Sequence, residues 1–238
     1  MKNDIAVFTP MANEETNAKK FILEILSYKK NFRKFKFFII IDRASTDNTY
    51  KIVKKLEKNN KCLKIIWAQD NQCIVDAYKE GYKACLATNY NWILEIDAGG
   101  SHLPRDLLSF SKFMNNKYDC IFGSRFCVGG KMINSNFIRY FFSKGGTILS
   151  KFFFKINLKD TTSGYQMFQR NIIKKIIKKG LLSRDRFFQT EIKIYLRKKK
   201  IKEIPISYMC KTQTIKMFAV IESLYLLILI KFSKKNYL

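Results

Sequence analysis

Residues 91–104 read Asn-Trp-Ile-Leu-Glu-Ile-Asp-Ala-Gly-Gly-Ser-His-Leu-Pro. A mainly apolar run, Trp92–Ile96, leads to Asp97, and two glycines, the only histidine of the chain and a proline follow. This order is typical of a buried parallel strand that carries one acid to the carboxyl edge of a sheet, where α/β proteins bind their ligands. The stretch therefore predicts an α/β fold with Asp97 in a ligand-binding site.

Apolar runs alternate with amphipathic stretches on both sides of this segment. We expect short buried strands at Ile5–Thr9, Phe37–Asp42, Leu63–Ala68, Trp92–Asp97 and Asp119–Phe122. Apolar residues at helical spacing predict helices at Glu15–Lys29, Asp47–Lys58, Ile74–Leu86 and Pro104–Asn115. Such alternation favours right-handed crossovers and a mostly parallel, Rossmann-like sheet flanked by helices.

The second half of the chain is richer in aromatic and basic residues. Phe137, Phe141, Ile148 and Phe152 lie at helical spacing with lysines and an arginine between them, as in helices that lie in a membrane interface. We therefore expect an acceptor-binding or membrane-interface helix at residues 134–156. The alternative is that this helix packs against the sheet.

A main domain is expected to span residues 1–212, followed by an apolar amphipathic helix and a basic tail at 213–238. The terminal helix could lie on a membrane or pack on the sheet, and the sequence favours neither. Its longest uninterrupted apolar run, Leu224–Ile230, is far shorter than the roughly 20 residues that cross a bilayer. We therefore expect no membrane-spanning segment.

The chain carries a net charge of +26, from 45 lysines and arginines against 19 acids. Such a surface attracts polyanions, which include nucleic acid, anionic lipid headgroups and phosphorylated substrates. A lysine-rich proteome would explain the charge equally well. Because the lysines do not cluster into one arm and no nucleic-acid-binding motif is present, nucleic acid is not an expected partner.

The six cysteines are scattered and form no Cys-x-x-Cys pair. Neither a zinc site nor a disulfide framework is therefore expected. The N-terminal residues lack the apolar core of a signal peptide. Together these features favour a reducing, cytoplasmic location.

Five further motifs surround Asp97 in the sequence. They are Val7–Glu15 with its Pro-x-x-Asn-Glu-Glu turn, Ile41–Thr49, Gly123–Phe126 followed by Gly129 and Gly130, Asp160–Tyr165, and Glu203–Ile206. In this order they resemble the family 2 glycosyltransferases of GT-A fold, particularly the polyprenyl-phosphate sugar transferases similar to dolichyl-phosphate mannose synthase. The resemblance covers residues 5–207, and it implies an inverting hexosyltransferase.

The resemblance implies that the ends of the first two strands hold the nucleotide of an activated sugar. The residues implied to bind this donor are Thr9, Pro10, Glu14, Asp42, Ala98 and Gly99. The nucleoside would lie against the first four, beyond the carboxyl ends of the strands. The alternative for Asp42 is that it caps the following helix together with Ser45 and Asp47.

Asp97 matches the first acid of the family's Asp-x-Asp metal motif, but Gly99 replaces the second acid. A divalent cation, Mg²⁺ or Mn²⁺, would take oxygen ligands here and stabilise the leaving diphosphate. Ser101 and His102 are further candidate ligands, although a lone histidine is more often structural. The missing acid weakens the metal expectation, since water, the diphosphate or basic side chains would have to replace it.

On the acceptor side, the resemblance implies that a lipid phosphate contacts Arg125, Arg139 and Ser143. Arg139 and Ser143 are four residues apart, so on a helix they share one face. The alternative is that these arginines are solvated or paired with acids. Glu191 is expected near the sugar, and for a hydroxyl acceptor Asp160 or Glu191 is the candidate base. The implied catalytic residues are Asp97, Arg125, Arg139 and Glu191.

The predicted function is the transfer of a sugar from a nucleoside-diphosphate sugar to a polyprenyl phosphate, with inversion, at the cytoplasmic face of the cell membrane. The enzyme would be peripheral, attracted to the anionic membrane surface, and would serve glycan biosynthesis. One alternative is transfer to a hydroxyl of a lipid-linked or surface glycan. Another is a catalytically degenerate protein that only binds nucleotide sugars, because Arg43, Ala44 and Cys73 also depart from the family pattern.

Overall fold

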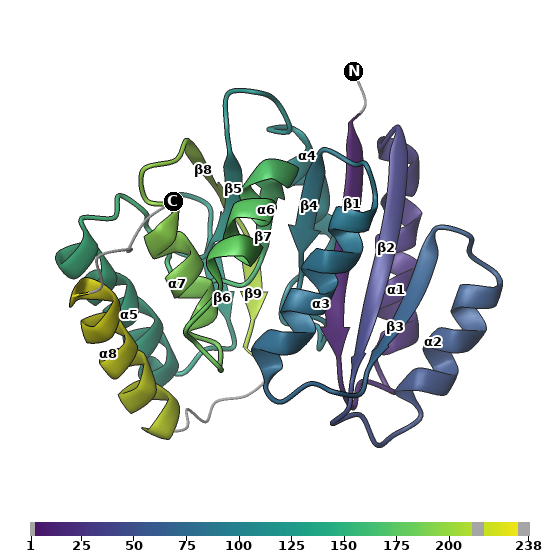
Figure 1. The fold of residues 1–238 in the computed structure, drawn as a ribbon, viewed down its shortest axis with the longest axis horizontal. Helices are drawn as coiled ribbons and strands as arrows, with labels where there is room; N and C mark the ends of the chain where they lie inside the picture. The colour runs from purple at the N-terminus through teal and green to yellow at the C-terminus, as the bar shows by residue number, and fades with distance from the viewer. Residues whose placement is uncertain (1–2, 211–216, 233–238) are drawn as a thin grey trace.

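A seven-stranded sheet forms the centre of the molecule, with strands in the order β3-β2-β1-β4-β7-β5-β8 (Figure 1). The computed structural model describes residues 3–210 and 217–232. The strands are β1 Asp4–Met11, β2 Lys34–Asp42, β3 Leu63–Ala68, β4 Trp92–Glu95, β5 Cys120–Ser124, β6 Lys131–Ile133, β7 Gln166–Gln169, β8 Ile201–Pro205 and β9 Ser207–Met209. The helices are α1 Ala18–Ser27, α2 Thr49–Lys58, α3 Ile74–Ala87, α4 Leu107–Ser111, α5 Phe137–Phe154, α6 Arg170–Lys179, α7 Phe188–Tyr195 and α8 Met217–Phe232.

The mostly parallel sheet predicted from the sequence is confirmed. Strands β1 to β4 pair in parallel, and so do β5 and β8. Strand β7 is antiparallel to both of its neighbours, β4 and β5, and it was not predicted because its Gln-Met-Phe-Gln sequence is short and lacks an apolar run. A separate pair, β6 with β9, lies outside the main sheet.

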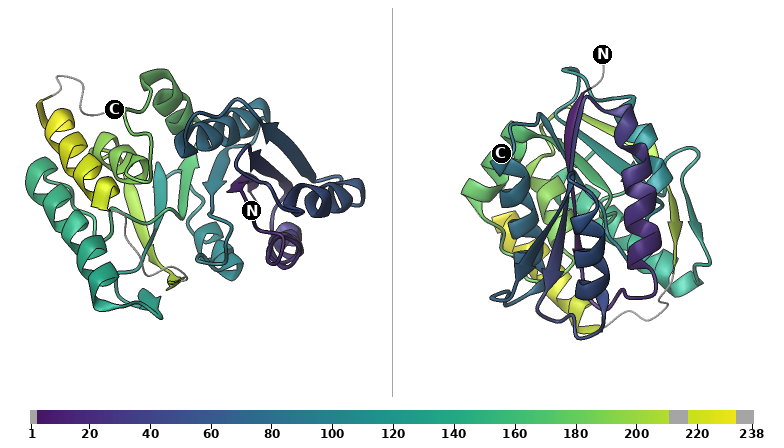
Figure 2. Two further views of the ribbon diagram at one scale, coloured as in Figure 1. Left: turned by 90° about the horizontal axis from the view of Figure 1, so that it is seen from below. Right: turned by 90° about the vertical axis from the view of Figure 1, so that its right-hand side faces the viewer.

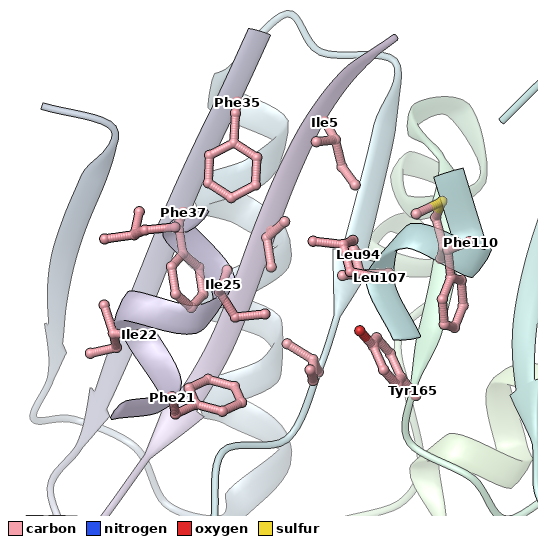
Figure 3. Close-up of a cluster of buried hydrophobic side chains, with 14 of the residues drawn as sticks. Ile5, Phe21, Ile22, Ile25, Phe35, Phe37, Leu94, Leu107, Phe110 and Tyr165 are labelled. Atoms are coloured by element: carbon pink, nitrogen blue, oxygen red, sulfur yellow. The ribbon is translucent and has the colours of Figure 1, made fainter. Parts of the chain in front are cut away.

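Both faces of the sheet are covered, as the near-continuous apolar strands require. Successive residues of a strand point to opposite faces, so Ile5 and Val7 of β1 join one apolar layer while Ala6 and Phe8 join the other. Helices α1, α2 and α4 contribute to the first layer, part of which Figure 3 shows. Helices α3, α6 and α7 contribute to the second, and the right-hand view of Figure 2 shows helices on both sides of the sheet.

Two helical segments differ from the expectation. The predicted helix Pro104–Asn115 is a 3-10 turn, Pro104–Asp106, followed by the short helix α4. The predicted helix Glu15–Lys29 begins only at Ala18 and ends at Ser27. Residues 15–17 form a turn in which the carbonyl of Glu14 accepts hydrogen bonds from the amides of Asn17 and Ala18.

Helices α5 and α8 lie side by side at one end of the molecule (Figures 1 and 2). The amine of Lys231 on α8 donates a hydrogen bond to the carbonyl of Phe153 on α5 at 2.7 Å. Leu227 and Ile230 of α8 are buried in the second apolar layer, so this helix does pack against the domain. The predicted basic tail lies in residues 233–238, outside the part of the chain that the structure describes.

The outer sides of α5 and α8 carry large apolar side chains that are more than half exposed. Among them are Phe137, Phe141, Ile148 and Phe152 on α5, and Ile221, Tyr225, Ile228 and Phe232 on α8. We refer to these eight residues as the α5/α8 surface. No helix within residues 3–210 and 217–232 combines the length and apolar character that crossing a membrane requires.

Candidate active site

The carboxyl ends of β1, β2 and β4 lie at one edge of the sheet, because the three strands are parallel neighbours. The ends of these strands and the segments after them carry the predicted donor-site residues Thr9, Pro10, Glu14, Asp42 and Asp97. Thr9 is fully buried within β1, whereas Pro10 is half-buried. The fold thus brings these predicted residues to the edge at which open α/β sheets bind ligands.

Asp42 organises the loop after β2. Its Oδ1 accepts a hydrogen bond from the amide of Ala44 at 2.9 Å, and its Oδ2 accepts one from Nδ2 of Asn71 at 3.0 Å. The N-cap residue of α2, Asn48, makes no side-chain cap bond, but Oδ1 of the preceding Asp47 accepts a hydrogen bond from the amide of Thr49 at 3.0 Å. Asp47, rather than Asp42, therefore bonds the start of α2, and Asp42 remains half-buried at the sheet edge.

Asp97 follows β4 and keeps 34% of its side chain exposed. Its Oδ1 accepts a hydrogen bond of 2.5 Å from the hydroxyl of Tyr78 on α3. Burial and the charge of Asp97 raise the pKa of Tyr78 well above its usual value, so the phenol stays a donor at neutral pH. Tyr78 therefore orients the carboxylate and leaves Oδ2 for another partner. No sequence motif indicated Tyr78, because the contact joins a helix to the end of a strand.

His102 is the second group beside Asp97. Its side chain is 1% exposed, and its Nδ1 lies 3.4 Å from Oδ2 of Asp97. The ring packs edge-on against Tyr165 and Tyr208, with centroid separations of 5.3 and 5.1 Å. Burial lowers the pKa of His102 to about 4 despite the charge of Asp97, so the ring is neutral at pH 7 and this contact is no ion pair. Among the described residues, neither ring nitrogen has a hydrogen-bond partner.

The turn after Asp97 contains the remaining predicted donor and metal residues. Gly99 and Gly100 have φ angles of +55° and +68°, a region that glycine adopts without steric cost. Ala98 is buried, and Gly99 and Ser101 are half-buried. The carbonyl of Ser101 accepts a hydrogen bond from the amide of Met209 at 2.8 Å, which ties this turn to β9.

The residues at this edge fit a divalent cation that is shared with a diphosphate. In the described part of the chain, no group of three or more His, Cys, Asp or Glu side chains could hold a metal ion. Mg²⁺, however, usually takes one or two protein carboxylates and completes its shell with phosphate oxygens and water. Asp97 and the carboxylate of Glu14, which faces Gly99, are suitable carboxylate donors. The buried ring nitrogens of His102 beside Asp97 have no hydrogen-bond partner among the described residues.

Glu95, the last residue of β4, is fully buried beside this site. Its carboxyl group contacts the hydroxyl of Tyr82 and accepts a hydrogen bond from Nε2 of Gln166 at 3.1 Å. Burial raises the pKa of Glu95 to about 8. The folded protein therefore holds a proton on Glu95 at pH values at which the unfolded chain has released it.

Replacement of Glu95 by glutamine should stabilise the protein at pH 8 to 9 and leave its stability near pH 4 almost unchanged. The folded pKa lies above the unfolded value of 4.5, so the wild type loses stability as the pH rises from 4.5 through 8. The gain at high pH should be a few kcal/mol, since one pKa unit is worth about 1.4 kcal/mol. Urea unfolding across this pH range would measure it, with Glu80→Gln on the exposed side of α3 as the control. A pH-independent difference would contradict the assignment.

Arg125 and Asp160 form a buried ion pair. The Nε and Nη2 atoms of Arg125 lie 2.7 and 2.8 Å from the two carboxylate oxygens of Asp160, and the Arg125 amide also donates to Oδ2 at 2.9 Å. Burial alone would raise the pKa of Asp160, but the charge and hydrogen bonds of Arg125 lower it to about 2. The alternative in which this arginine pairs with an acid thus agrees with the structure. Asp160 is correspondingly unsuited to act as a general base, which corrects that expectation.

Arg139 lies in the first turn of α5, and Ser143 one turn later on the same helix. The Nη2 atom of Arg139 donates a hydrogen bond to the hydroxyl of Tyr208 at 3.0 Å. The guanidinium carbons of Arg125 and Arg139 lie 5.3 and 5.8 Å from the Tyr208 ring centroid. Tyr208 therefore contacts both predicted acceptor-side arginines and, through its ring, His102 on the donor side. The sequence offered no signal for Tyr208, which lies on the short strand β9.

A cavity of about 480 Å³ opens between the loop after β5 and the first turns of α5. Its lining includes Lys131, Ser135, Asn136, Tyr140 and Lys144. The Lys144 amine lies 4.5 Å from the centroid of the Phe126 ring. The two lysines and the polar side chains make this cavity suited to an anionic group.

Glu191 makes its contacts with its own helix and with the loop before it. It is fully buried on α7, and its carboxylate accepts hydrogen bonds from the amides of Leu182 and Ser183 and from the hydroxyls of Ser183 and Tyr195, at 2.5 to 2.9 Å. These contacts hold the loop before α7. Because these contacts occupy the Glu191 oxygens, its expected role as a catalytic residue or base is not supported.

The sequence of this chain is similar to those of known proteins. The model of the family described as "Glycosyl transferase family 2" matches residues 6–177. The chain is 26% identical over 172 residues to the undecaprenyl-phosphate mannosyltransferase of Micrococcus luteus, an alignment that covers 71% of this chain and 70% of that protein. It is 30% identical over 116 residues to the polyprenol monophosphomannose synthase of Mycolicibacterium smegmatis, covering 49% of this chain and 44% of that protein.

The fold is also shared with solved glycosyltransferase structures. One is glucosyl-3-phosphoglycerate synthase from Mycobacterium tuberculosis in complex with Mn²⁺, UDP and glucosyl-3-phosphoglycerate. It superposes with a TM-score of 0.66 at 10% sequence identity, covering 98% of this chain and 80% of that chain. On the family match and this shared GT-A architecture, the chain belongs to glycosyl transferase family 2 and is a glycosyltransferase.

Proposed function

We propose that this enzyme transfers a sugar from a nucleoside-diphosphate sugar to a polyprenyl phosphate, with inversion, at the cytoplasmic face of the cell membrane. The choice of a phosphate acceptor rests on the two candidate bases, Asp160 and Glu191, whose carboxylates are both occupied by other groups. Asp160 is paired with Arg125, and Glu191 is buried with its oxygens occupied. A hydroxyl acceptor needs a base near its proton, whereas a phosphate acceptor is already ionised. This difference favours the phosphate over the hydroxyl of a glycan.

The cation Arg139 on the acceptor side is linked to the donor side through Tyr208. Arg139 is half-buried, and Tyr208 separates it from His102 and Asp97. A guanidinium binds phosphate oxygens through several donors in one plane, so Arg139 can hold the acceptor while one phosphate oxygen attacks the anomeric carbon. That displacement breaks the bond to the leaving diphosphate and inverts the configuration. A divalent cation, when bound at Asp97, would stabilise the charge of that diphosphate.

The names of two relatives support a polyprenyl acceptor, since they are an undecaprenyl-phosphate mannosyltransferase and a polyprenol monophosphomannose synthase. They also make mannose the first sugar to test. Arg125, which lines the cavity at the start of α5, would then position the acceptor site through its contacts with Asp160 and the Tyr208 ring.

Replacement of Arg139 by alanine should lower transfer to undecaprenyl phosphate by about 10- to 100-fold, because a hydrogen bond to a charged group is worth about 1.5 to 3 kcal/mol. Donor binding, measured by thermal shift with UDP- and GDP-sugars, should not change. Transfer would be measured with labelled mannose and glucose donors, and the exposed Arg105→Ala variant is the control. Undiminished transfer by Arg139→Ala, or wild-type transfer only to hydroxyl acceptors, would refute the proposed acceptor.

The α5/α8 surface supports a peripheral position on an anionic membrane. Its exposed Phe137 and Phe152, each 79% accessible, lie on a helix that also carries Lys144 and Lys151. Apolar side chains enter the headgroup region while lysines attract anionic lipid. This surface adjoins the basic cavity at the start of α5, so a lipid phosphate could approach that cavity while its chain stays in the bilayer.

Replacement of Phe137 and Phe152 by serine should weaken binding to phosphatidylglycerol-containing vesicles by about tenfold or more, because burial of each phenylalanine contributes about 1.5 to 3 kcal/mol. Vesicle sedimentation would measure the affinity, and added salt should weaken the remaining binding. The control is Leu23→Ser, which removes an exposed apolar side chain on the distant helix α1. Equal vesicle binding by the double variant and the control would argue against this surface as the membrane contact.

A further inference from the structure

The space beside Gly99, where the family's second metal-binding acid would lie, is occupied by another carboxylate. A Cβ atom built on Gly99 would lie 2.9 Å from Oε1 of Glu14, 3.7 Å from its Cδ and 4.0 Å from its Oε2. A distance of 2.9 Å is shorter than real Cβ contacts. A side chain at position 99 and the Glu14 carboxylate in its present position therefore exclude each other.

The backbone of Glu14 is firmly held in this position. Its amide donates a hydrogen bond to Oγ1 of Thr49 at 2.7 Å, and its carbonyl accepts from the amides of Asn17 and Ala18 at 2.9 and 2.7 Å. The preceding Asn13 adopts φ +57°, and its side chain bonds the loop after β2. The carboxylate is thus delivered from the end of β1 to the turn that follows its parallel neighbour β4.

An independent observation indicates that the space beside Asp97 is built for a further ligand. His102 is 1% exposed, and its Nδ1 lies 3.4 Å from Oδ2 of Asp97. Neither ring nitrogen is hydrogen-bonded within the described residues. Buried polar atoms normally have partners, and a bound cation with its water would supply one.

We propose that Glu14 replaces the missing second acid, so that Asp97 and Glu14 together hold a divalent cation against the diphosphate of the donor. Two carboxylates, phosphate oxygens and water make up the ligand set that Mg²⁺ prefers. The inference rests on the proposed function, because the nucleotide supplies the remaining ligands. It also gives Glu14 a role different from the nucleoside contact that the family resemblance implies.

Mn²⁺ binding tests this inference without an activity assay. The free ion would be measured by electron paramagnetic resonance, with Mn²⁺ alone and with Mn²⁺ plus UDP or GDP. Loss of outer-shell partners already weakens metal binding by about 10- to 100-fold, so Glu14→Gln and Asp97→Asn should each weaken Mn²⁺ binding in the presence of nucleotide by at least about tenfold. The control is Glu15→Gln, which removes the negative charge of the neighbouring residue. The Glu15 carboxylate accepts hydrogen bonds from the amide and the side chain of Asn48.

A sharper test moves the carboxylate from position 14 to position 99. Gly99→Asp alone should gain no affinity, because its Cβ would lie 2.9 Å from Oε1 of Glu14 and the two carboxylates would compete for the same space. The φ of +55° strains any side chain at position 99, although aspartate tolerates this region better than most residues. The double variant Glu14→Ala with Gly99→Asp should therefore recover part of the Mn²⁺ affinity that Glu14→Ala loses. Circular dichroism would confirm that each variant is folded, and the conservative Glu14→Gln variant tests the inference even if the double variant does not fold.

The outcomes separate this inference from the proposed function. If Glu14→Gln binds Mn²⁺ as the wild type does while Asp97→Asn loses it, Glu14 is no metal ligand but the donor site stands. If Glu14→Gln weakens UDP or GDP binding equally in EDTA, Glu14 contacts the nucleoside and the inference is overturned. If the wild type binds neither nucleotide under any condition, the proposed function fails and the inference fails with it.

Discussion

Replacement of Asp97 by asparagine should reduce sugar transfer by about a hundredfold or more. Asp97 is the acid that β4 delivers to the carboxyl edge of the sheet, and it is oriented there by the hydroxyl of Tyr78. A metal ion that stabilises a leaving group contributes several kcal/mol, and each 1.4 kcal/mol is about tenfold in rate. Asparagine keeps the shape and can still accept from Tyr78, but it lacks the negative charge that recruits the cation.

The comparison that isolates this effect is kcat/KM for transfer at a fixed Mg²⁺ concentration, together with thermal unfolding. Glu80→Gln on α3 is the matched control, because it removes a carboxylate whose partner is Lys83 on the exposed side of the same helix. The control should retain full activity, and both variants should unfold within a few degrees of the wild type. Full transfer by Asp97→Asn would show that the catalytic centre lies elsewhere.

Removal of either partner of the Arg125–Asp160 pair should lower the free energy of unfolding by about 3 to 5 kcal/mol. Both side chains are buried, so Arg125→Met or Asp160→Leu leaves one charge without its partner in a low-dielectric environment, the costly case for a buried pair. Combining the two substitutions removes both charges and should recover most of the loss. Urea unfolding of the two single variants and the double variant measures the coupling between them.

The pH dependence gives a second measure of the same pair. The folded pKa of Asp160 is lowered to about 2 from 3.8, so its contribution is fully present above pH 4 and is lost as the pH falls toward 2. The wild type should therefore lose more stability than the double variant between pH 4 and 2. Single variants as stable as the wild type, or a double variant less stable than both, would contradict this account.

The strands and the donor edge were predictable because they depend on local sequence. Apolar runs such as Trp92–Ile96 become buried regardless of which elements pack against them. A parallel arrangement then brings their carboxyl ends to one edge of the sheet. Asp42 and Asp97 could therefore be assigned to one edge before any contact was known, and the structure agrees. The roles of these residues in binding remain predictions.

The partners of the charged residues were not predictable in the same way. Arg125 and Asp160 are 35 positions apart, and nothing in either motif shows that they pair. The Glu191 carboxylate is held by a loop and by Tyr195 on its own helix, a pairing that depends on how that loop folds. Residue type indicates that a group can be charged, but its neighbours decide whether the charge is available to a ligand.

The sequence by itself determined the alternation of strands and helices, the acid at the end of β4 and the absence of a second acid at Gly99. Only the tertiary structure decided that Glu14 faces that glycine, that Tyr78 orients Asp97, and that Tyr208 lies between the donor and acceptor sides. The physical reason is the separation along the chain of the residues that interact. Hydrophobic periodicity acts between neighbours in the chain, whereas these contacts form only after separate strands, helices and turns have packed together.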